Sequence, residues 1–120
     1  AYSCRAHFVA ALHDKPSAIL LPTGEIIAST TNYFDHVSAR INLDCALFHL
    51  DFNWPKLEAA KAMYGRRLSV HDPGFLGSVL LACGDDGLTI DQIIGEFKLE
   101  PLDDYFNRVS VHRETHLNDR

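Results

Sequence analysis

The sequence predicts an α+β fold, in which an antiparallel sheet is preceded by an N-terminal helix and carries several helices across one face. Three observations predict this class. Two apolar segments flank a Pro-Thr-Gly turn near the start, helix start and stop residues recur in the middle, and the last third alternates apolar and polar residues. A chain of 120 residues with 47% hydrophobic side chains fits one domain, residues 1–120.

The first expected element is a helix of about ten residues. Ser3 can cap it, and Pro16 disfavours helical geometry just before itself. So short a helix is not stable alone, so its apolar stripe must pack against something. We predict that this stripe pairs with a second copy of the chain, with packing on its own sheet as the alternative; its residues are Phe8, Val9 and Leu12.

Residues 17–31 predict an antiparallel hairpin. The apolar segments 17–21 and 25–31 lie on either side of Pro22, Thr23 and Gly24, which are residues typical of a tight turn.

Two helices are expected in the middle of the chain. Asn53, Trp54 and Pro55 can begin the first, which Gly65 ends. Asp72 and Pro73 repeat the start pattern, and the apolar residues up to Cys83 predict a second helix over residues 73–83.

The last third allows two interpretations. Alternation over residues 97–102 and 105–113 predicts a second hairpin, which we favour because Val109 and Val111 suit a strand. The alternative is a DNA-binding helix-turn-helix within residues 73–113, since Thr89 and Gln92 form a capping box. Its second helix, however, would carry Asp103 and Asp104 near the phosphates.

The order of elements resembles a PAS domain, a small α+β sensor fold. The resemblance rests on residues 18–27, which are similar to the opening hairpin of the family, and on Tyr33, which occupies an aromatic position; Thr30 stands where the family often has asparagine. Short PAS-like domains of bacterial transcription activators, such as the plasmid-transfer regulator TraJ, have a similar start.

The PAS resemblance implies a pocket between sheet and helices that takes a small-molecule ligand. For haem, His71 is the nearest candidate ligand, but it precedes the expected helix, and no cysteine lies in a flavin-binding motif, so no cofactor is assigned. The same residues could equally form a filled core. The expected lining is Leu20, Ile27, Tyr33, Leu57, Leu76, Leu80 and Phe97.

Charge and cysteine content restrict the partners. A formal net charge of −5, with Arg66–Arg67 as the one adjacent basic pair, argues against direct nucleic-acid binding. Three cysteines without CxxC spacing are typical of a reducing compartment, so we expect a cytoplasmic location. No apolar run approaches the length of a membrane span.

Two pairs of residues spaced four apart have side chains that could serve in catalysis or metal binding. On a helix, Cys45 and His49 would pair as a thiol and its base, and His112 and His116 would share a metal. Neither pair comes with the other residues that such sites need. We therefore assign no catalytic and no metal-binding residues, and keep a small Cys/His-dependent enzyme as an alternative.

The sequence thus predicts a non-enzymatic sensing or dimerisation domain of a bacterial transcription regulator. Because the chain begins at Ala1 and its only methionine is Met63, we interpret it as part of a longer protein.

Overall fold

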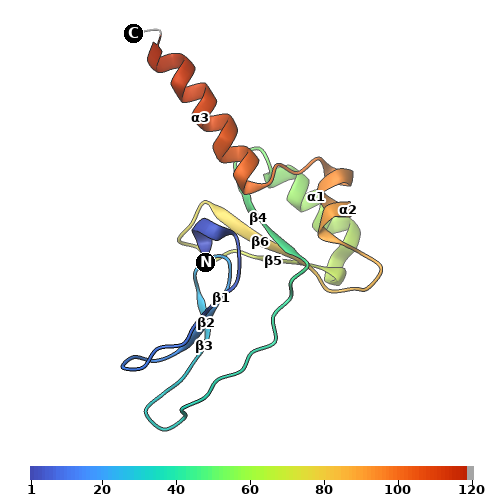
Figure 1. Ribbon diagram of the computed structural model, residues 1–120. Helices are drawn as coiled ribbons and strands as arrows, with labels where there is room; N and C mark the ends of the chain where they lie inside the picture. The colour runs from blue at the N-terminus through green and yellow to red at the C-terminus, as the bar shows by residue number, and fades with distance from the viewer. Residues whose placement is uncertain (119–120) are drawn as a thin grey trace.

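The computed structural model describes residues 1–118 and confirms the α+β class, but it contains two sheets rather than the single PAS sheet (Figure 1). Both sheets are antiparallel and three-stranded, with strand orders β1-β2-β3 (sheet A) and β4-β6-β5 (sheet B). The strands are β1 (Phe8–Ala10), β2 (Ala18–Leu20), β3 (Ile26–Ser29), β4 (Cys45–His49), β5 (Leu68–His71) and β6 (Ser78–Cys83). The helices are α1 (Trp54–Tyr64), α2 (Ile90–Phe97) and α3 (Leu102–Asn118), with short 3-10 turns at Tyr2–Cys4 and Gly65–Arg67.

Sheet A confirms the hairpin predicted around Gly24, because β2 pairs antiparallel with β3. The predicted N-terminal helix is absent, so this prediction is wrong. The helical turn ends at Arg5, whose φ of 52° is left-handed, and the chain then enters β1, which pairs with β2 in the register Val9↔Ile19. Phe8 and Val9 therefore belong to a strand, and Leu12 follows it. The helical spacing of the apolar residues is a local signal. The pairing of residues 8–10 with β2, about ten residues away, decides their structure instead.

Sheet B is the centre of the molecule, and its middle strand β6 is buried on both faces. One face packs against α1 and α2 through Val79 and Leu81, and the other packs against α3 and the N-terminal turn through Leu80. The predicted helix over residues 73–83 is therefore wrong. A strand covered on both sides is apolar at successive positions, and periodicity does not distinguish such a run from a buried helix.

Helix α1 confirms the predicted helix and its end at Gly65, whose φ is 54°. Helix α2 begins at the predicted capping box, in which Thr89 and Gln92 bond each other's backbone amides. The favoured hairpin over residues 97–113 is wrong, and the helices of the alternative interpretation are present. Leu102, Tyr105 and Val109 recur at helical spacing, and this pattern prevailed over the alternation.

Helix α3 leaves the body of the molecule after its first turns (Figure 1). Of its described residues only Leu102 is buried. The radius of gyration is 17.2 Å, whereas a compact domain of this length has about 14 Å. The molecule is therefore extended.

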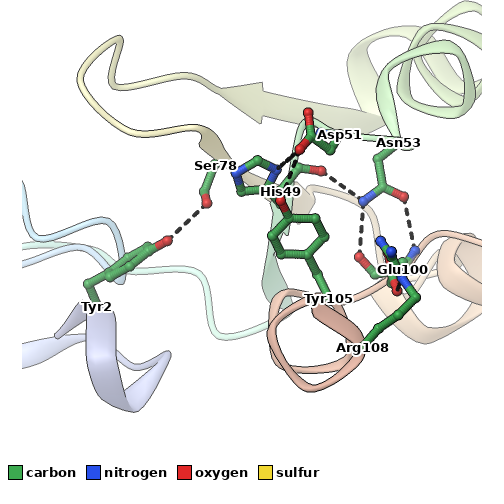
Figure 2. Close-up of polar contacts among 8 residues, drawn as sticks. All are labelled: Tyr2, His49, Asp51, Asn53, Ser78, Glu100, Tyr105 and Arg108. Carbon is green, nitrogen blue, oxygen red and sulfur yellow. Dashed lines mark hydrogen bonds and ion pairs between the residues drawn. The ribbon is translucent and has the colours of Figure 1, made fainter. Parts of the chain in front are cut away.

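A buried asparagine holds the start of α3 against sheet B and α1 (Figure 2). The Asn53 side chain is fully buried and does not cap α1. Its amide nitrogen donates to the carbonyls of His49 and Glu100, at 2.8 and 3.0 Å, and its oxygen accepts from the Glu100 amide at 3.0 Å. The segment before α3 is thereby tied to the end of β4.

We expect Asn53→Ala to lower the free energy of unfolding by about 2–3 kcal/mol, because the partners of Asn53 lose their hydrogen bonds. Chemical denaturation measures this change. The control is Asn107→Ala on the exposed side of α3, which should alter stability by less than about 0.5 kcal/mol. Equal losses in the two variants would contradict the role of Asn53.

Candidate functional site

A polar cluster lies where β4 meets α3, and it includes the residue types of a hydrolytic triad (Figure 2). His49 stacks on Tyr105 with ring centroids 4.1 Å apart. The Asp51 amide donates to His49 Nδ1 at 3.1 Å, and the Tyr105 hydroxyl donates to Asp51 Oδ2 at 2.9 Å. Ser78 is the cross-strand partner of His49.

The contacts of this cluster do not activate a nucleophile. Ser78 is fully buried, and its hydroxyl shares a hydrogen bond with the Tyr2 hydroxyl at 3.0 Å. His49 Nδ1 accepts from the Asp51 amide and lies 3.6 Å from Asp51 Oδ2, whereas a triad histidine donates a hydrogen bond from that atom to a carboxylate. Within residues 1–118 every buried polar side-chain atom has a hydrogen-bond partner. The cluster therefore acts as a structural joint.

Arg108 extends this joint along α3. Its guanidinium donates to both carboxylate oxygens of Glu100, at 2.7 and 2.9 Å, and lies 5.0 Å from the Phe52 ring centroid. The bond from Arg108 is the main reason that the pKa of Glu100 lies below its ordinary value. Such bidentate pairs fix geometry as well as charge. The sequence indicated Asn53 only as a helix start, because its partner Glu100 is 47 residues away in the chain. It did not indicate the Glu100–Arg108 pair, because residues 97–113 were expected to form a hairpin.

Of the two candidate pairs with a spacing of four residues, the structure brings only the two histidines together. Cys45 and His49 lie on strand β4, where four residues span about 13 Å, so the thiol and the imidazole are not brought together. His112 and His116 lie on α3 and stack at 4.2 Å. No group of three or more His, Cys, Asp or Glu residues among the described residues is arranged to hold a metal.

The cysteine thiols are free and form no disulfide. Cys4 is exposed, Cys45 half-buried and Cys83 buried. Burial, followed by the nearby charge of Asp44, raises the pKa of the Cys45 and Cys83 thiols above the ordinary value. A raised pKa reduces the fraction of reactive thiolate at neutral pH.

The residues expected to line a PAS pocket are distributed over different layers. Leu57 and Phe97 pack on one face of sheet B, and Leu80 packs on the other. Leu20 and Ile27 lie in sheet A, Tyr33 is 86% exposed in the segment after β3, and Leu76 is half-buried before β6. His71 lies on β5 and pairs with Glu25.

An apolar groove of about 370 Å³ lies between α1 and sheet B. Leu57 is the one expected pocket residue that lines it. The other lining residues are the apolar Leu50, Trp54, Val70 and Val79 and the charged Glu58, Lys61 and Asp72. Its volume is near the lower end of small-molecule sites.

The most unusual surface of the molecule is sheet A, which is apolar and largely uncovered. The side chains Phe8, Val9 and Ile26 are 50%, 68% and 63% exposed. The register Phe8↔Leu20↔Ile26 places an apolar row across one face of all three strands. We call the exposed side chains on and beside this sheet the sheet A surface; they are Phe8, Val9, Leu12, Ile26 and Ile27. These side chains leave much of the apolar surface of sheet A exposed to solvent.

An ion pair between sheets A and B helps to orient the sheet A surface. His71 Nε2 on β5 lies 2.5 Å from Glu25 Oε2 in the β2–β3 turn, and the Thr23 hydroxyl donates to the same oxygen at 2.9 Å. Chiefly through the bond with His71, the pKa of Glu25 lies below its ordinary value of 4.5. At a pH above the pKa that Glu25 has in the unfolded chain, the contact therefore stabilises the fold in full. This stabilisation is lost as the pH falls through the lower pKa of Glu25 in the folded protein.

We expect His71→Ala to raise the pKa of Glu25 toward 4.5, because its main hydrogen-bond partner is removed. An NMR titration of the Glu25 carboxyl measures this pKa. His13→Ala removes another exposed histidine, whose carboxylate partner is Asp14, and should leave the Glu25 pKa unchanged. The same Glu25 pKa in all three proteins would argue against the contact.

Comparisons with known protein families, curated proteins and solved structures found no match for this chain. No helix within residues 1–118 is long and apolar enough to cross a membrane.

Proposed function

We propose that this chain is a non-enzymatic regulatory domain that acts by self-association, as a module of a cytoplasmic transcription regulator of bacteria. The observation that carries this proposal is the amount of exposed surface. The chain exposes 8324 Å², whereas a compact protein of its mass exposes about 6,500 Å². The surplus exceeds the roughly 800 Å² that each partner buries in a standard interface.

The composition of the sheet A surface supports the same role. It includes Phe8 and Val9 on strand β1 and Leu12 just after it, the residues that the sequence suggested for a dimer interface on a helix. Exposed apolar side chains in this number favour association with another protein. The engaged hydroxyl of Ser78 and the raised pKa values of the Cys45 and Cys83 thiols support a non-enzymatic role.

The sensing part of the proposed role requires a ligand site. The groove between α1 and sheet B is the place that the geometry offers, since its apolar lining suits a small apolar molecule.

We expect the protein to be a dimer in light scattering, with about twice the chain mass of 13.4 kDa. Ile26→Glu should weaken the dimer by at least about tenfold, because a charge would be buried without a partner. Met63→Glu on α1 is the control, since Met63 is 64% exposed and Ile26 is 63% exposed. A wild-type monomer throughout a dilution series would refute self-association.

DNA binding is the second candidate function, because α2 and α3 follow one another as in a helix-turn-helix. Two observations disfavour it. The first turn of α3 carries Asp103 and Asp104, and the chain has a net charge of −5. Both oppose approach to phosphates.

Mobility-shift assays at about 50 and 150 mM salt should therefore show no retention of duplex DNA. The supporting result is free DNA at every protein concentration at the higher salt. Sequence-selective binding tighter than about 1 μM there would instead favour the helix-turn-helix function.

A further inference from the structure

Strand β3 is an outer strand of sheet A, and no other strand of residues 1–118 pairs with its free edge. Ala28 pairs with Ile19, and the Thr30 amide donates to the Ser17 carbonyl at 2.9 Å, so both residues turn their backbone groups toward β2. Backbone groups alternate in direction along an antiparallel strand. The amide and carbonyl of Ser29 therefore point outward.

The side chains along this edge do not prevent pairing. Residues 26–32 contain no charged residue and no proline, and Ser29 is exposed. Natural proteins usually protect free edges with lysine, proline or cover. The outer strand β5 of sheet B follows this rule, because Asp72 and Pro73 come directly after it. The β3 edge lacks these protections.

The segment after β3 does not shield this edge by packing. Residues 31–43 are all exposed except Val37, which is half-buried. The Thr31 amide donates to the Phe34 carbonyl in a local turn. The chain therefore turns away after β3 and does not cover the free edge.

We infer that a second copy of this chain adds antiparallel to β3, with Ser29 facing Ser29 of the partner copy across a two-fold axis. This inference rests on the proposed self-association and names its interface. Two outward-facing Ser29 residues would exchange both amide-to-carbonyl hydrogen bonds, which is the pattern of a hydrogen-bonded antiparallel pair. An edge paired with itself is isologous, so the assembly closes as a dimer.

The exposed surface area is sufficient for a second copy of the chain, and the uncharged edge of β3 tolerates one. The surplus exposed surface is enough for a standard dimer interface. Two copies that each carry a net charge of −5 repel one another, and an uncharged contact segment keeps that repulsion away from the interface. The joined sheet would have six strands, three from each copy.

The first test is Ser29→Lys, which places two like charges directly opposite one another in the proposed pair. Ser69→Lys on β5 makes the same change at an exposed serine of the other sheet. Light scattering should show Ser29→Lys as a monomer at concentrations where the wild type and Ser69→Lys are dimers. Circular dichroism checks that both variants fold.

The second test is crosslinking, and it does not depend on the behaviour of the lysine variants. Cys4 is exposed and is first replaced by serine. In that background Ser29→Cys should give a covalent dimer with a short bis-maleimide, because facing residues of such a pair lie about 5.5 Å apart. Ser69→Cys is the control and should remain uncrosslinked.

The outcomes separate the two proposals. A monomeric wild type would overturn both self-association and pairing through β3, and would leave the edge to a different protein. A dimeric wild type in which Ser29→Lys still dimerises and Ser29→Cys does not crosslink would overturn the β3 pairing alone. Loss of the dimer in Ser29→Lys together with crosslinking of Ser29→Cys would support it.

Discussion

Burial of β6 on both faces is the constraint on which the rest of the structure depends. Val79 and Leu81 face α1 and α2, whereas Leu80 faces α3 and the N-terminal turn. Since β4 and β5 flank β6, every helix is placed by its contact with this sheet or its ends. The joint around Asn53 then determines where α3 starts (Figure 2). The side chains of His49, Asp51 and Ser78 near that joint form hydrogen bonds within it.

Sheet A contacts the core around sheet B at only a few residues. Leu21 and Tyr2 pack against the outer face of sheet B, and His71 reaches Glu25, but the sheet A surface itself stays uncovered. The buried core lies around sheet B, and sheet A leaves Phe8, Val9 and Ile26 at least half exposed. The proposed role therefore follows from what the fold leaves uncovered.

Local patterns of the sequence predicted the elements that depend on neighbours in the chain. The hairpin around Gly24, the helix ending at Gly65 and the capping box of Thr89 and Gln92 are present as expected. The order of the expected elements also predicted the α+β class, which the structure confirms. Of the candidate interface, Phe8, Val9 and Leu12 are exposed, and whether they lie in a dimer interface stays a prediction.

By itself, then, the sequence determined the hairpin turn at Gly24, the end of α1 at Gly65 and the capping box of α2, because each depends on a few adjacent residues. Only the tertiary structure decided that residues 78–83 form a central strand, that Phe8 and Val9 join a sheet, and that the chain forms two sheets. It also decided that Ser29 turns its backbone to a free edge. Strand pairing and two-sided burial join residues far apart in the chain, and short-range spacing carries no information about such partners.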